Sequence, residues 1–171
     1  MILADASPLI VLAKLRRLEL LYDLYGEVLI GPVVKAETID AGNAIRARGV
    51  EQLEHALERG WLQMACPTAG ERSFMEGLVR RSRLDRGEAE AIAFASTRDL
   101  RLIVDDKEAR SVAVATGVKI VGTAGVLLEA CLGAHLDREE LEAVLQDLVQ
   151  VLWISPAVVA EILRLAREAR I

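Results

Sequence analysis

The chain has 171 residues, of which 53% are apolar and 27% charged, as is typical of one globular domain with a continuous core. Its formal net charge of −5 at pH 7 argues against a broad phosphate-binding surface. A local basic rim could still bind a nucleic acid strand.

Short apolar runs alternate along the chain with segments of helical periodicity. Four of these runs are nearly continuously apolar, as strands buried on both faces of a parallel sheet should be, and the run at 61–66 is a weaker candidate. The predicted strands are residues 2–4, 28–30, 61–66, 102–104 and 118–121. The predicted helices are residues 33–41, 49–59, 71–81, 88–96, 107–115, 125–132, 137–148 and 156–169.

Strands that alternate with helices imply βαβ units. We therefore predict an α/β protein, a three-layer α/β/α sandwich with a central parallel sheet of four to five strands. Residues 1–133 are expected to form this domain, and residues 134–171 a helical C-terminal extension packed on it. The last helix carries an apolar stripe that could pack on the domain or on a partner.

Spacing and segment length exclude two further classes of site. Cys66 and Cys131 stand apart, as do His55 and His135, so the sequence lacks the ligand spacing of a zinc site. No apolar run approaches the roughly 18 residues that a membrane span needs. Met1–Ala4 leads directly into Asp5 without the pattern of a signal peptide. We expect a cytoplasmic protein with no membrane segment.

Acidic residues follow two of the predicted buried strands. Asp5 comes directly after residues 2–4, and Asp105 and Asp106 come directly after residues 102–104. Functional residues of parallel α/β sheets gather where strands end and helices begin. If the two strands are adjacent, we expect these acids to converge at one edge of the sheet.

Two further acids lie on predicted helices. Glu37 follows Val33 and Val34 at helical spacing, and Glu88 shares a face with Ile92, so each continues an apolar stripe. A pair of carboxylates ~4 Å apart repels by about 4 kcal/mol at an effective dielectric of 20. A hard cation such as Mg²⁺ or Mn²⁺ removes this repulsion, activates water and neutralises a phosphate. The acids therefore favour a metal-dependent phosphodiesterase.

Each acid also has a structural explanation. Ser7 followed by proline fits an N-cap, which would leave Asp5 as a turn residue, and Asp105 with Glu108 fits a capping box. Glu88 suits the first turn of a helix. Capping does not explain the apolar stripes that Glu37 and Glu88 continue, so the acids taken together favour a site.

Five segments of the chain carry a family resemblance through their order and spacing. They are DASPLIVLAKL, GPVVKAET, LDRGEAEAIAFA, LIVDDKEAR and GVKIVGTAGVL, and they extend from residue 1 to about residue 128. The chain resembles the PIN-domain nucleases, and specifically a PIN-like branch of small prokaryotic proteins related to the toxins of toxin–antitoxin pairs. The resemblance implies an α/β/α sandwich that cleaves RNA with Mg²⁺ or Mn²⁺, a homodimer and a small protein antitoxin.

The resemblance also implies roles for individual residues. The catalytic residues would be Asp5, Glu37, Glu88, Asp105 and Asp106, and all but Glu37 are expected to bind metal. Glu88 stands where the toxins usually have aspartate, and Glu90 is a lower-ranked alternative on the opposite helix face. Which of Asp105 and Asp106 faces the metal is open. Ser7 matches a small hydroxyl residue that supports the site.

Basic residues flank the acids on both sides. Arg83 and Arg86 precede Glu88, and Lys107 and Arg110 follow the Asp pair, so we expect these four to contact RNA. Such charge runs are more often solvated helix ends. Because only 4% of residues are aromatic, we expect recognition of single-stranded RNA by backbone and shape rather than by base stacking.

The predicted function is a metal-dependent endoribonuclease, the toxin of a toxin–antitoxin pair. The alternative is a non-catalytic PIN-like binding protein that retains a metal site. Loss of cleavage would predict a neutral residue in place of a core acid, and the matching positions are all acidic. Ser7 excludes a haloacid-dehalogenase phosphatase, which needs aspartate there, and no GxxxxGK phosphate loop is present.

Overall fold

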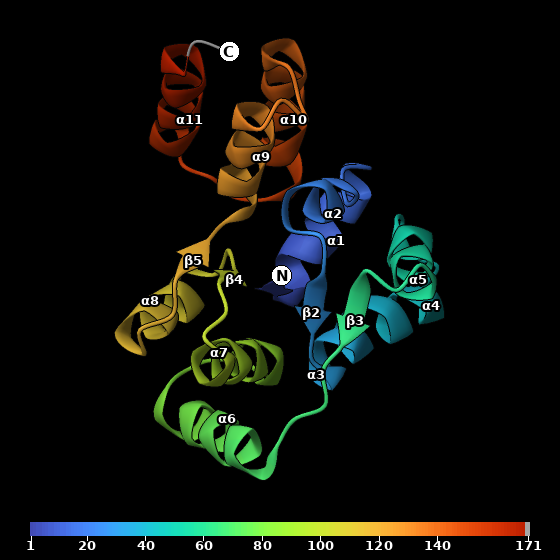
Figure 1. The fold of residues 1–171 in the computed structure, drawn as a ribbon, viewed down its shortest axis with the longest axis vertical. Helices are drawn as coiled ribbons and strands as arrows, with labels where there is room; N and C mark the ends of the chain where they lie inside the picture. Colours follow the sequence, from blue (N-terminus) through green and yellow to red (C-terminus); the bar gives the residue numbers. More distant parts are fainter. Residues whose placement is uncertain (170–171) are drawn as a thin grey trace.

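A computed structural model describes residues 1–169. Within them, five strands form one parallel sheet in the order β3-β2-β1-β4-β5 (Figure 1). The strands are β1 (Ile2–Ala4), β2 (Val28–Ile30), β3 (Leu62–Met64), β4 (Leu102–Ile103) and β5 (Ile120–Val121). Helices cover the sheet, so the predicted α/β/α sandwich with a central parallel sheet is confirmed.

Most helices of the described residues separate into two layers. One layer contains α1 (Ala6–Lys14), α2 (Leu20–Tyr25), α5 (Val50–Glu58), α9 (Thr123–Leu132), α10 (Arg138–Val151) and α11 (Pro156–Glu168). The other contains α6 (Ala69–Arg81), α7 (Arg86–Arg98) and α8 (Lys107–Ala115). Ile2 and Ala4 pack in the first core and Leu3 in the second, because side chains alternate across a strand. This alternation explains why each strand is apolar throughout.

A continuous helical segment follows β2 in place of the predicted helix 33–41. It consists of α3 (Pro32–Lys35), a π-helix (Ala36–Asp40) and α4 (Ala41–Ala44). Single π-helical turns occur mostly within α-helices and frequently at functional sites. Glu37 lies in this turn.

The short helix α2 was not predicted. Its six residues, LLYDLY, give too short a window for a helical period, and burial of Leu20 and Leu21 in the core holds it in place. The strands after residue 100 are also shorter than predicted, since β4 ends at Ile103 and β5 begins at Ile120.

The helices after Gly133 pack on one another and on α9 (Figure 1). Ile162 and Ala166 of the predicted stripe are buried in the first core, whereas Val158 is 45% exposed. The division of the chain at residue 133 stays a prediction, and residues 170 and 171 of the predicted extension lie outside the described residues. No helix of residues 1–169 is long and apolar enough to cross a membrane.

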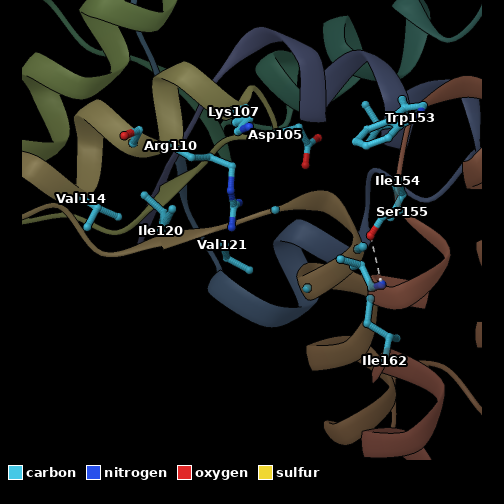
Figure 2. Close-up of a pocket in the computed structure, with 16 residues that line it drawn as sticks. Asp105, Lys107, Arg110, Val114, Ile120, Val121, Trp153, Ile154, Ser155 and Ile162 are labelled. Carbon is cyan, nitrogen blue, oxygen red and sulfur yellow. Dashed lines mark hydrogen bonds between the residues drawn. The ribbon is translucent and has the colours of Figure 1, made fainter. Parts of the chain in front are cut away.

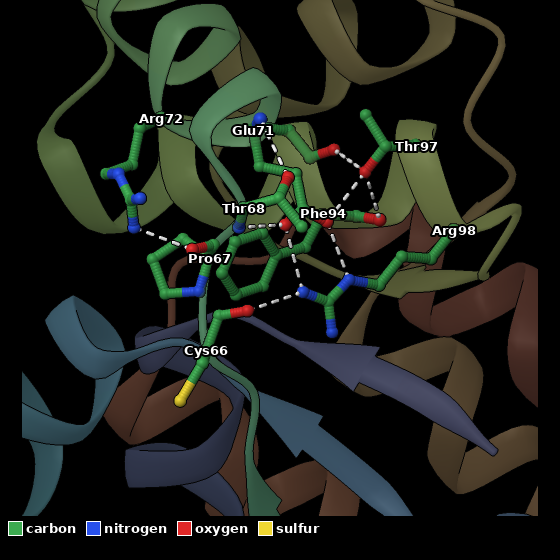
Figure 3. Close-up of polar contacts among 9 residues, drawn as sticks. Cys66, Pro67, Thr68, Glu71, Arg72, Phe94, Thr97 and Arg98 are labelled. Atoms are coloured by element: carbon green, nitrogen blue, oxygen red, sulfur yellow. Dashed lines mark hydrogen bonds and ion pairs between the residues drawn. The ribbon is translucent and has the colours of Figure 1, made fainter.

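A buried carboxylate ties α6 to α7 (Figure 3). Glu71 forms a capping box with Thr68 at the start of α6 and accepts hydrogen bonds from the hydroxyl of Thr97 and the guanidinium of Arg98. The Arg98 hydrogen bonds lower the pKa of Glu71 to about 2. The network therefore joins the start of α6 to the last turn of α7, so that the two helices pack as an antiparallel pair.

Candidate active site

Asp5 lies where β1 runs into α1, in the middle of the sheet. Its N–H donates to the carbonyl of Ile103 at 3.0 Å, which continues the pairing of β1 with β4. Asp5 occupies the N-cap position, but its side chain makes no capping hydrogen bond, and the residue is only 4% exposed. The expected Ser7 cap is wrong, because α1 begins at Ala6 and Ser7 lies half-buried in its first turn.

Asp105 and Asp106 are held at the starts of two different helices. Asp105 accepts hydrogen bonds from the N–H and the hydroxyl of Thr123, at 2.8 and 2.6 Å, at the beginning of α9. Asp106 caps α8 by accepting from the N–H of Ala109 at 2.8 Å. The expected capping box is therefore wrong by one residue, since Asp106 is the cap and Glu108 instead accepts from the N–H of Arg83.

Glu88 forms a capping box with Asp85 at the start of α7. The N–H of Glu88 donates to Asp85, and the N–H of Asp85 donates to Glu88, at 2.8 and 2.9 Å. The prediction that Glu88 stabilises the first turn of a helix is therefore correct, and it does not exclude a role in a site. Asp85 is an acid that sequence reasoning missed, although the D-x-x-E spacing of LDRGE is the signal of such a box.

Glu37 extends from the π-helical turn to the first turn of α7. The residue is exposed, yet a Cβ built on Gly87 would collide with its carboxylate oxygens. Its carboxylate therefore lies against the α7 backbone, where only glycine leaves room for it. The apolar-stripe argument placed Glu37 at the edge of the core, and the π-helical turn moves it outward.

Glu90 projects from the other face of α7, as its spacing from Glu88 predicts. It is 2% exposed and accepts hydrogen bonds from the N–H groups of Val33 and Val34, at 3.0 and 3.4 Å. Its carboxylate therefore serves the first turn of α3, where these backbone groups have no partner within the helix.

Burial and neighbouring acids raise the pKa of Asp5 and of Glu88. Burial raises the pKa of Asp5 to about 6, and the charges of Asp85, Glu37 and Asp105 add to the effect. Burial likewise raises the pKa of Glu88 to about 7, with Asp85, Asp106 and Asp5 contributing. We call these residues the acid cluster, which comprises Asp5, Glu37, Asp85, Glu88, Asp105 and Asp106.

A comparison with protein families assigns the chain to one of them. The family model DUF3368, described as a PIN domain, matches residues 1–168. The chain belongs to the PIN-domain family. No curated protein sequence gives a significant match to it. The match extends from Met1 into α11 and assigns a nuclease-type fold to the protein.

The donor chemistry of this PIN domain fits a hard divalent cation. The acid cluster offers only carboxylate oxygens, and none of its members forms an ion pair with a basic side chain of residues 1–169. In the described chain, however, no three His, Cys, Asp or Glu side chains are grouped closely enough to hold a metal ion. The cluster therefore has the ligand type and the excess negative charge of a metal site without a closed coordination shell.

The basic residues expected to contact RNA lie at the starts of α7 and α8, next in sequence to acids of the cluster. Arg83 and Arg86 are exposed in the loop and first turn that lead into α7. Lys107 is exposed at the start of α8, and Arg110 donates to the carbonyl of Val104 at 2.9 Å. Lys107 and Arg110 also line a cavity that reaches Asp105.

Proposed function

We propose that this PIN domain is a Mg²⁺- or Mn²⁺-dependent endoribonuclease with the acid cluster as its centre. The observation that carries the proposal is the state of Asp5. Its carboxylate is buried at the end of the central strand and makes no N-cap hydrogen bond into α1. Burial and the charges of Asp85, Glu37 and Asp105 raise its pKa to about 6, in spite of a hydrogen bond from the backbone of Ala6. Such an arrangement opposes folding, and a bound cation would compensate for it.

Asp5, Glu88, Asp105 and Asp106 are the proposed metal ligands. A divalent ion held there would supply Lewis-acid chemistry, by activating water and neutralising charge on a phosphate. Thr123 orients Asp105 through two hydrogen bonds, and Asp85 orients the backbone of Glu88. Glu37, which lies against Gly87, supplies a further carboxylate at the edge of the cluster.

Single-stranded RNA is the proposed substrate. Four basic side chains would bind its phosphates, namely Arg83, Arg86, Lys107 and Arg110. These local positive charges favour an anionic chain as ligand in spite of the overall charge of −5. The preference for RNA, the toxin role, the small protein antitoxin and the homodimer are proposed from the family resemblance. Growth arrest on expression in bacteria, relieved by Asp5→Asn, tests the toxin role.

The nuclease proposal is tested by cleavage of single-stranded RNA in the presence of Mn²⁺ or EDTA. We expect wild type to cleave only with the cation and Asp5→Asn to be inactive while retaining its circular dichroism spectrum. Asp23→Asn is the matched control, because Asp23 is an exposed aspartate on α2, outside the acid cluster. Equal cleavage by Asp5→Asn and wild type would disprove the assignment.

A non-catalytic binding protein is the second candidate function. The sequence predicts for it a retained metal site, but the form that the structure favours has none. In residues 1–169 no three His, Cys, Asp or Glu side chains are grouped to hold a metal, and Glu88 and Asp106 have capping roles. Under this proposal the protein would bind RNA with the same affinity in Mn²⁺ and EDTA and leave it intact. The cleavage assay therefore separates the two candidates.

A further inference from the structure

A cavity of about 790 Å³ lies beside the acid cluster, at the open edge of the sheet (Figure 2). It is bounded by α8, by the edge strand β5, by the first turn of α9, by the segment that joins α10 to α11 and by the first half of α11. Asp105, Lys107 and Arg110 lie on one side of it and Trp153 on the other. The remaining wall is largely apolar, with Val114, Ile120, Ile154 and Val158 among its residues.

Trp153 is 89% exposed at the rim of this cavity. Tryptophan is highly buried on average, and the other tryptophan of the chain, Trp61, is only 4% exposed. An indole that stands in solvent next to an apolar wall is available to contact a flat ligand.

The charges of the cavity limit what that ligand can be. Asp105 belongs both to the cavity and to the acid cluster, so a ligand here also approaches the proposed metal centre. Lys107 and Arg110 form no ion pair with a side chain of the described residues. The basic side chains favour an anionic group, and the exposed indole favours a flat apolar group. A nucleotide of a single strand carries both, as its phosphate and its base.

We propose that Trp153 is a stacking platform for one unpaired base of the substrate, with Lys107 and Arg110 holding the adjoining phosphate. The inference rests on the proposed function, because it places the base beside the phosphate that approaches the acid cluster. Stacking on an aromatic side chain contributes about 1–3 kcal/mol per base and requires that the base be unpaired. The composition argued against base stacking, but a single exposed tryptophan at this position is sufficient for it.

Binding can be measured separately from cleavage in the Asp5→Asn background, with EDTA present. The probes are a short single-stranded RNA and a strand of the same length with abasic sites. We expect Trp153→Ala to weaken binding of the normal RNA by about 5- to 100-fold. Trp153→Phe should recover most of the loss, because it restores an aromatic face.

The effect of Trp153→Ala on each of the two strands separates stacking from other effects of the indole. If Trp153 stacks on a base, Trp153→Ala causes little further loss with the abasic strand, since the interaction is already absent. Val151→Ala, an exposed apolar residue outside the cavity lining, should bind both strands as the parent does.

Three outcomes would overturn the inference. The first is unchanged binding of normal RNA by Trp153→Ala, and the second is an equal loss with the normal and abasic strands. The third is that Trp153→Ala changes the protein from dimer to monomer in sedimentation and leaves RNA binding intact. This result would make the cavity an interface between two copies of the chain. Failure of the nuclease proposal would give a different result. RNA binding would still depend on Trp153 and on the bases, but no protein that keeps Asp5, wild type included, would cleave RNA.

Discussion

Asp105 accepts two hydrogen bonds from Thr123, one from the N–H at 2.8 Å and one from the hydroxyl at 2.6 Å. The pair joins the end of β4 to the first residue of α9, and Thr123 is fully buried. Both oxygens of the carboxylate are engaged, so the orientation of the Asp105 side chain is fixed against the start of α9. A hydrogen bond to a charged group contributes about 1.5–3 kcal/mol.

Replacing the Thr123 hydroxyl tests this orientation. Thr123→Val keeps the shape of the side chain and removes one of the two donors to Asp105. We expect RNA cleavage to fall on the order of 10- to 100-fold, the equivalent of that hydrogen bond in the transition state. Thr116→Val is the control, because its hydroxyl donates only within α8. An equal effect of both substitutions would contradict the role of Asp105.

Gly87 should be required for function more than for stability. In Gly87→Ala the new methyl group collides with the carboxylate end of Glu37, which can swing away because that side chain is flexible and exposed. We expect cleavage to fall at least ~10-fold while the free energy of unfolding changes by less than about 1 kcal/mol. Gly77→Ala in α6, where a Cβ meets open space, should leave cleavage unchanged. Full activity of Gly87→Ala would remove Glu37 from the site.

The Glu71 network predicts a pH dependence of stability. Hydrogen bonds from Arg98 lower the pKa of Glu71 from 4.5 to about 2, so the folded state favours the charged carboxylate. This stabilisation is present above pH 4.5 and is lost as the pH falls from 4.5 to 2, and it amounts to about 3 kcal/mol. Urea unfolding of wild type and Glu71→Gln at pH 7 and pH 3 measures the difference.

At pH 7 we expect Glu71→Gln to be less stable than wild type by about 3 kcal/mol, with a smaller gap at pH 3. Glu76→Gln is the control, since Glu76 pairs with Arg80 at the surface and such pairs contribute less than about 1 kcal/mol. A gap that does not change with pH would show that Glu71 acts through packing alone.

Salt dependence tests the phosphate contacts. If Arg86 binds a phosphate, Arg86→Gln should reduce the slope of log K against log salt by about 0.7, the value for one contact with a single strand. Arg164→Gln should not change the slope, because Arg164 pairs with Glu161 and Glu168 on α11. Identical slopes for Arg86→Gln and wild type would remove Arg86 from the RNA-binding surface.

The sequence was sufficient to predict the sheet and most of the acid cluster, because both follow from local patterns. An acid that directly follows a buried apolar strand lies at the carboxyl edge of a parallel sheet, and Asp5 and Asp105 were found in this way. The prediction assumed that the two strands are neighbours, and the pairing of β1 with β4 meets that condition. The one-residue error at the α8 cap has a physical reason. Both residues of the Asp105-Asp106 pair are suitable N-caps, and only the position of Thr123 decides which one turns away from α8.

Other features depend on contacts between distant segments and could not be predicted. The space that Gly87 leaves for Glu37 depends on the packing of the π-helical turn against α7. Trp153 is an isolated aromatic residue in the sequence, and its exposure beside Asp105 follows from how α11 packs on α9. The role proposed for Trp153 could therefore not be predicted from local sequence patterns.

The central claim is that the acid cluster binds a divalent cation through Asp5. Calorimetric titration of Mn²⁺ into wild type, Asp5→Asn and the control Asp23→Asn tests it most directly. We predict saturable binding by wild type and Asp23→Asn and none by folded Asp5→Asn. Equal binding by wild type and Asp5→Asn, or binding by none of the three proteins, would contradict the claim.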